Sequence, residues 1–190
     1  MGRLILVRHA RPVVDPNRGA DEWELHPAGQ DALERLAALP LFAGAQRIVS
    51  STERKAIATA EAIRRHHTLP PLEQREALGE LRKGSFVHGD HDAVMARLFE
   101  QPDQPVLEGW ESGSDARQRF STCLEQLAAE TEDLIVVTHG TVLSLYLAAL
   151  RGQERVDFAE WRSIGMPDVA VVDTGARKLV REFSGRKTNA

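Results

Sequence analysis

Short apolar runs alternate along the chain with longer segments whose apolar residues recur every three or four positions. A continuous apolar run that is bounded by polar or turn residues is typical of a strand buried on both faces of a sheet. The predicted strands are 4–7, 47–50, 134–137, 169–172 and 178–180, with a short edge strand that begins at 71. An Asp173-Thr174-Gly175 turn joins the last two runs and predicts that they form a hairpin.

Helical spacing of apolar residues predicts helices that pack on this sheet. They lie within 27–37, 52–67, 93–99, 116–127 and 142–150. Ser51 or Thr52 is expected to cap the helix that ends at His67, and Cys123 falls on the apolar face of a helix. The alternation of strands and helices predicts an α/β fold, a three-layer sandwich with a mostly parallel central sheet and helices on both faces.

Length and composition narrow the possible classes of protein. A chain of 190 residues buries about 70% of its extended surface on folding, so we expect a single domain over 1–190 with a polar tail from about residue 184. The formal net charge of −4 gives no overall positive field, and nucleic acid is therefore not an expected partner. No window reaches the 18 apolar residues of a membrane span. With one cysteine and no signal-peptide-like start, a cytoplasmic location is expected, and the oligomeric state stays open.

Two of the predicted strands end on histidine. Arg8 and His9 follow the run 4–7, and His139 follows the run 134–137. Because ligands of open α/β sheets bind outside the carboxyl ends of the strands, both histidines are expected at the same edge. Arginine offers a planar fork of donors that suits phosphate, and histidine can act as a nucleophile, a base or a metal ligand. The pattern therefore indicates chemistry on an anion.

Three motifs in order carry a resemblance to a known family. Val7-Arg8-His9-Ala10, the block 50–60 with its Ser51-Thr52-Glu53-Arg54-Lys55-Ala56 core, and Val137-Thr138-His139-Gly140 together resemble the histidine phosphatase (phosphoglycerate mutase-like) superfamily. The resemblance spans residues 4 to about 150. It implies a metal-independent phosphomonoester hydrolase that needs no cofactor and works through a phosphohistidine. The expected substrate is a small phosphorylated molecule or a phosphoprotein.

The resemblance also implies roles for individual residues. His9 would be the nucleophile, with Arg8 and His139 on the phosphoryl oxygens and Gly140 beginning a helix whose amides join them. The cation before Ala56, usually arginine, is Lys55 here, so either Lys55 or the neighbouring Arg54 takes that role.

The general acid is expected within the segment 73–80. Leu78-Gly79-Glu80 is similar to the family's Leu-x-Glu, whose carboxyl group protonates the leaving oxygen. The residues that follow, 82–85, depart from the family pattern, so Glu73 and Glu76 remain alternative acids. Glu111 and Ser112 resemble a Gly-Glu-Ser series that shapes the site or starts a helix.

Three other functions fit parts of the sequence. A phosphoglycerate-type phosphomutase would use the same phosphohistidine, although the short segment after Glu80 leaves little room for a bisphosphate. A non-catalytic module that binds a phosphorylated ligand is suggested by Lys55 and by Ala10, which stands where the family mostly has glycine. A metal-dependent hydrolase would need ligands such as His88, Asp90 and His91, but Asp90 also fits a helix cap in the segment 86–109, where substrate selection is expected.

Overall fold

The computed structural model describes residues 2–84, 86–129 and 133–185. Within them a six-stranded sheet has the order β3-β2-β4-β1-β5-β6. The strands are β1 (Arg3–Arg8), β2 (Arg47–Ser50), β3 (Glu73–Gln74), β4 (Asp133–Thr138), β5 (Asp168–Asp173) and β6 (Lys178–Arg181). The first four are parallel to one another, and β5 and β6 are antiparallel to their neighbours. The predicted α/β class and mostly parallel sheet are confirmed.

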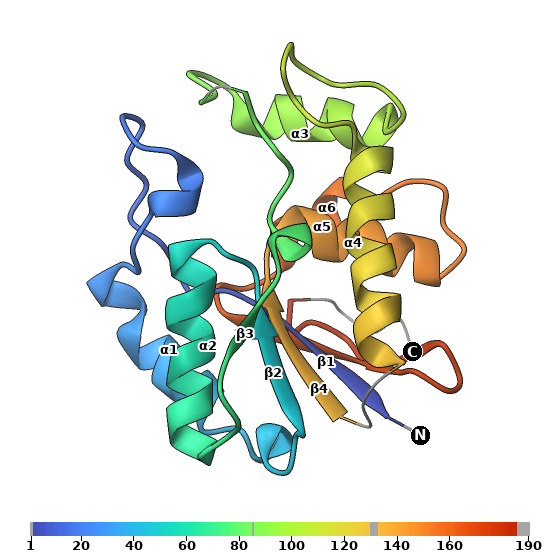
Figure 1. The fold of residues 1–190 in the computed structure, drawn as a ribbon. Coiled ribbons are helices and arrows are strands. Elements are labelled where there is room, and N and C mark those ends of the chain that lie inside the picture. The colour runs from blue at the N-terminus through green and yellow to red at the C-terminus, as the bar shows by residue number, and fades with distance from the viewer. Residues whose placement is uncertain (1, 85, 130–132, 186–190) are drawn as a thin grey trace.

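Helices cover both faces of the sheet (Figure 1). They are α1 (Gln30–Ala37), α2 (Arg54–His67), α3 (His91–Glu100), α4 (Gly113–Ala128), α5 (Gly140–Leu150) and α6 (Phe158–Ser163), with 3-10 turns Ala20–Glu22, Pro27–Gly29, Pro40–Phe42 and Glu76–Leu78. In Figure 1, α1 and α2 lie on one side of the sheet and α4, α5 and α6 on the other, while α3 lies beyond its edge.

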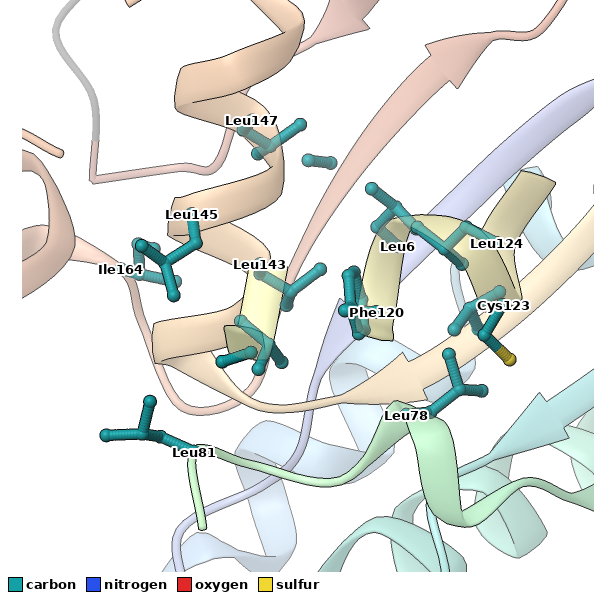
Figure 2. Packing of buried hydrophobic residues seen from close by; sticks show 14 of the residues in the cluster. Leu6, Leu78, Leu81, Phe120, Cys123, Leu124, Leu143, Leu145, Leu147 and Ile164 are labelled. Carbon is teal, nitrogen blue, oxygen red and sulfur yellow. The ribbon is translucent and has the colours of Figure 1, made fainter. Parts of the chain in front are cut away.

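Successive side chains of β1 point to opposite faces of the sheet and belong to two separate core clusters. Leu4 and Leu6 pack in the cluster under α4 and α5, whereas Ile5 and Val7 pack in the cluster under α1 and α2. Figure 2 shows the first cluster, in which Leu6 of β1 meets side chains of α4 and α5. Cys123 is buried in this cluster, as its helical position predicts. Because β1 is buried on both faces, its carboxyl end is fixed firmly in place.

One local expectation needs correction, and two further features go beyond what the sequence predicts. Neither Ser51 nor Thr52 caps α2, because Glu53 occupies the capping position without a side-chain cap bond and the Ser51 hydroxyl contacts His139 instead. Helix α6 was not anticipated, since its six residues are too few to show a period. The first residue of the predicted polar tail is held by hydrogen bonds, because Ser184 donates from its amide and its hydroxyl to Asp168. The tail from 186 onward lies outside the described residues.

Candidate active site

Strand register places the two motif histidines side by side. β1 and β4 pair in parallel with Arg8 opposite Thr138, so His9 and His139 follow at the same edge of the sheet. The His9 amide donates to the carbonyl of Thr138 over 2.9 Å. The two ring centroids are 5.0 Å apart, and both residues are buried. The predicted meeting of two strand-end histidines is therefore present in the fold.

The hydrogen bonding of His9 leaves one ring nitrogen without a proton. Nδ1 lies 2.7 Å from the carbonyl oxygen of Ala10; because a carbonyl only accepts, Nδ1 carries the proton and Nε2 of the neutral ring keeps its lone pair. Burial, the neighbouring His139, and the charges of Lys55 and Arg8 lower the pKa of His9 well below its ordinary value. A neutral ring with an available lone pair is the form that a nucleophile requires.

Ala10 fits its position without backbone strain. Among the described residues other than glycine, only Thr68 and Arg177 have a positive φ. The Ala10 amide donates to the Thr59 hydroxyl over 3.0 Å, and that hydroxyl donates to the carbonyl of Lys55 over 2.8 Å. Alanine in place of glycine therefore causes no backbone strain at this position.

Glu53 belongs to the site, although the sequence analysis gave it no role. The only sequence signal was its position within the second motif block. It is 8% exposed, and its Oε1 accepts from the amide of Glu80 over 2.7 Å and lies 3.1 Å from His139 Nε2. Ser51 Oγ lies 2.7 Å from the same nitrogen. Burial lowers the pKa of His139 to about 3, so its ring is neutral at neutral pH. The Nδ1 atom of His139 is buried and has no hydrogen-bond partner among the residues that the structure describes.

The two candidate cations of α2 have different surroundings. Lys55 is buried, donates to the Ala20 carbonyl over 2.5 Å and forms an ion pair with Glu53. Arg54 is exposed and forms an ion pair with Glu24 over 2.8 Å. Lys55 is thus the residue whose charge acts on His9, as the order of the motif indicates.

Of the three candidate acids, only Glu80 lies with the histidines. Its carboxylate accepts from the amides of Thr141 and Val142 at the start of α5, over 3.1 and 3.2 Å. Burial acts to raise the pKa of Glu80, but the charge of Lys83 and hydrogen bonds from backbone amides outweigh it and hold that pKa below its ordinary value. Glu73 is paired with Arg47, and Glu76 is exposed and paired with Arg82.

Arg8 and Gly140 lie against each other where β1 and α5 meet. Arg8 Nη1 donates to the carbonyl of Ile164 over 2.6 Å, and within the described ranges its buried Nε has no hydrogen-bond partner. A Cβ atom on Gly140 would lie 2.9 Å from Arg8 Nε and 3.0 Å from Cζ. Glycine is therefore required at 140 by the close approach of the guanidinium.

Gly140→Ala is expected to displace the Arg8 guanidinium and to lower kcat/KM for a phosphomonoester by about 10- to 100-fold, the worth of one charged hydrogen bond. The fold should survive, because the clash falls on the end of a side chain. Steady-state kinetics with a circular dichroism melt checks this. Ser144→Ala on the same helix is the control and should stay within about twofold of the native protein. Native kinetics in Gly140→Ala would show that Arg8 need not occupy this place.

The segment around Glu80 is held in place by an ion pair between Glu111, which the sequence analysis named, and Arg119, to which it gave no role. Arg119 binds Glu111 through two nitrogens, over 2.9 and 2.8 Å, and donates to the carbonyls of Ala77 and Gly79. Glu111 also accepts from the Arg82 amide over 3.1 Å. Glu111 thereby shapes the site, whereas Ser112 caps α4.

The proposed metal ligands of the segment 86–109 serve other purposes. Asp90 caps α3 by accepting from the Ala93 amide over 3.0 Å, and His91 Nε2 lies 3.4 Å from Lys83 Nζ. In the part of the chain that the structure describes, no three His, Cys, Asp or Glu side chains are grouped so as to hold a metal ion. No described helix has the length and apolar character to cross a membrane.

Comparisons with known proteins agree with this geometry. The family model described as histidine phosphatase superfamily (branch 1) matches residues 4–180. No curated protein matches the chain in sequence. Many solved structures share the fold, among them the following three. YhfR of Bacillus stearothermophilus is 22% identical with a TM-score of 0.78, covering 99% of this chain and 98% of its own.

The other two structures carry the names of phosphatases. The mycobacterial glucosyl-3-phosphoglycerate phosphatase, in complex with VO3, is 20% identical with a TM-score of 0.77, and the match covers 98% of this chain and 100% of that one. A mutant phosphoserine phosphatase from Entamoeba histolytica, in complex with phosphoserine, is 19% identical with a TM-score of 0.74, and the match covers 98% of each chain. At these identities the likeness establishes the fold.

Proposed function

Because this chain belongs to the histidine phosphatase superfamily (branch 1), we propose that it is a metal-independent phosphomonoester hydrolase that forms a phosphohistidine on His9. The observation that carries the proposal is the His9 ring: its Nδ1 proton is committed to the Ala10 carbonyl, which leaves a neutral Nε2 among buried cationic groups. A cytoplasmic location and a small phosphorylated substrate are part of the same proposal, and the names of the two phosphatases of similar fold support such a substrate.

In the first step His9 Nε2 attacks phosphorus. A P–N bond forms while the P–O bond to the leaving group breaks, and negative charge spreads over the three remaining phosphoryl oxygens. Arg8, Lys55 and His139 stabilise that charge, with the amides at the start of α5. His139 donates to a phosphoryl oxygen from Nδ1, the ring nitrogen that has no partner among the described residues. Because Nε2 lies against the Glu53 carboxylate, this requires the ring to carry both protons, and the negative charge of a bound phosphoryl group favours that form.

Glu80 supplies a proton to the leaving oxygen and recovers one from the water that cleaves the P–N bond. In the free protein its pKa lies below the ordinary value, so it is ionised at neutral pH. A phosphoryl group at the start of α5 competes for the Thr141 and Val142 amides and brings negative charge close to Glu80. Both effects raise the pKa of the carboxyl, and a substrate that binds as its monoanion brings the needed proton.

The proposal is tested by hydrolysis of para-nitrophenyl phosphate in EDTA between pH 5 and 8. Equal release of nitrophenol and phosphate is expected. Since the pKa of His9 lies well below 6.5, its protonation should not reduce the rate between pH 7 and pH 6. Loss of activity in EDTA would favour a metal-dependent hydrolase, and nitrophenol without phosphate would favour transfer to a second hydroxyl, as in a mutase. Phosphate binding without turnover would favour the non-catalytic module.

A further inference from the structure

Asp168 is a buried carboxylate that the proposed chemistry does not use. It begins β5, and the residue is 4% exposed. Among the residues that the structure describes, no lysine or arginine lies at ion-pair distance from it. Burying a carboxylate without such a partner is costly unless hydrogen bonds hold it. The groups that donate to Asp168 therefore indicate what it does.

Hydrogen bonds from three segments fix this carboxylate. Oδ1 accepts from the amide of Val169 over 2.8 Å and from that of Ser184 over 3.1 Å. Oδ2 accepts from the Gly165 amide over 3.0 Å, and from the amide and the hydroxyl of Ser184 over 3.1 and 3.0 Å. The carboxylate therefore joins the start of β5 to the segment before it and to the segment after β6, and it cannot rotate without losing several of these bonds.

The bond to Gly165 connects Asp168 to Arg8. The Gly165 N–H and the Ile164 carbonyl belong to one planar peptide group. Asp168 accepts from the nitrogen end of this group over 3.0 Å, and Arg8 Nη1 donates to its oxygen end over 2.6 Å. A peptide group whose N–H is bonded to a carboxylate is polarised, so its oxygen becomes a stronger acceptor for a guanidinium. Asp168 thus fixes the place and the strength of the acceptor that Arg8 uses.

The same two residues face each other in the sheet. Arg8 ends β1, and the antiparallel register of β1 and β5 places it opposite Asp168. Burial lowers the pKa of Arg8, and the charges of Glu80 and Asp168 act in the opposite direction. The charge of Asp168 is therefore close enough to act on the guanidinium, while the hydrogen bonds between them run through the Ile164–Gly165 peptide.

The bond at Nη1 decides which donors of Arg8 remain for a ligand. The guanidinium has two further nitrogens, Nε and Nη2, on its other edge. Nε is buried and, in the described part of the chain, has no hydrogen-bond partner. This edge lies beside Gly140 at the start of α5, since a Cβ atom there would be 2.9 Å from Nε and 3.1 Å from Nη2. Two nitrogens on one edge are the arrangement with which arginine binds a phosphate through parallel hydrogen bonds.

We propose that Asp168 is a positioning residue for Arg8: through the Ile164–Gly165 peptide it holds the guanidinium so that the Nε and Nη2 edge meets the phosphoryl group at the start of α5. The inference rests on the proposed hydrolase, because it assigns to Asp168 a role in the phosphoryl pocket of that same site. Asp168 acts through Arg8 and does not contact the substrate.

A double-mutant cycle with Arg8 tests this role. Asp168→Ala should lower kcat/KM for para-nitrophenyl phosphate by about 10- to 100-fold, the worth of one charged hydrogen bond. In an Arg8→Met background, which has no guanidinium to position, the same substitution should cost less than about twofold. Ser184→Ala removes one bond to the carboxylate and leaves that of Gly165, so this control should stay within about twofold of the native protein. Circular dichroism melts identify a temperature at which all variants are folded.

The cycle separates positioning from a purely structural role. If Asp168 only tied the segment around Ser184 to the sheet, Asp168→Ala would cost equally with and without Arg8, or would lower the melting temperature and keep native kinetics. Either result would overturn the proposal. If Asp168→Ala does not fold, Asp168→Asn replaces it in the cycle, because the amide conserves the volume and removes the charge. Its cost should be about threefold or more with Arg8 present and should vanish in Arg8→Met; no cost, or an equal cost in both backgrounds, would overturn the proposal.

Binding of tungstate, a tetrahedral dianion that is not turned over, separates this inference from the proposed function. In calorimetry, Asp168→Ala should weaken tungstate binding about tenfold or more when Arg8 is present and less than about twofold in Arg8→Met. This result without hydrolysis of any phosphomonoester would support the role of Asp168 and overturn the hydrolase. Hydrolysis with an additive cycle would overturn the role of Asp168 alone. A native protein that neither binds tungstate nor hydrolyses a phosphomonoester would overturn both.

Discussion

His9→Ala is expected to lower kcat for any phosphomonoester by at least about a thousandfold, because the step that forms the P–N bond has no other nucleophile. His139 is not expected to replace it, because its Nε2 lies against Ser51 and Glu53 and its Nδ1 is proposed to donate to a phosphoryl oxygen. The loss should appear in kcat, while substrate binding persists through Arg8 and Lys55. Single-turnover and steady-state phosphate release measure the two separately.

Trapping of the phosphoenzyme makes this prediction specific. The native protein, quenched during turnover of ³²P-labelled substrate, should retain label that is stable to alkali and lost in acid, as a P–N bond requires. His9→Ala should retain none. His66→Ala, which removes an exposed histidine at the end of α2, is the matched control and should behave as the native protein. Label that persists in His9→Ala would place the nucleophile elsewhere.

The strands and the histidine pair were predictable because their causes are local. The run 4–7 is apolar without interruption, which is the pattern of a strand buried on both faces, and His9 simply follows it. The run before His139 has the same form. Two parallel strands bring their ends together whatever lies between them in sequence. The fold class and the meeting of the two histidines follow from these runs.

The place of Glu53 in the site was not predictable, because its surroundings are assembled from distant segments. Glu53 is buried only because the Glu80 amide and His139 come to it from two other elements. The choice between Lys55 and Arg54 as the phosphate-binding cation was open for a similar reason. The loop that carries Ala20 and Glu24 decides it, because Lys55 is buried against Ala20 whereas Arg54 is exposed and pairs with Glu24.

Glu80→Gln is expected to lower kcat for an alkyl phosphate by about 10²–10⁴-fold, the usual range for loss of a positioned general acid. The glutamine carbonyl oxygen can still accept from the Val142 and Leu81 amides, which both bond to Oε1, but the bond that Oε2 accepts from Thr141 is lost. Two of the three backbone bonds remain, so the loop and the start of α5 should largely keep their places. What the variant chiefly loses is the proton. The cost should therefore depend on how much the leaving oxygen needs one.

The comparison of two leaving groups tests that dependence. Nitrophenolate leaves without a proton, so Glu80→Gln should cost less than about tenfold with para-nitrophenyl phosphate, far less than with an alkyl phosphate. Glu76→Gln, which alters an exposed carboxylate paired with Arg82, should leave both rates unchanged. An equal loss with both leaving groups would mean that Glu80 positions α5 or the phosphoryl group and does not act as the acid. Because Glu73 and Glu76 are both held in ion pairs away from the histidines, the proton would then have to come from the substrate monoanion itself.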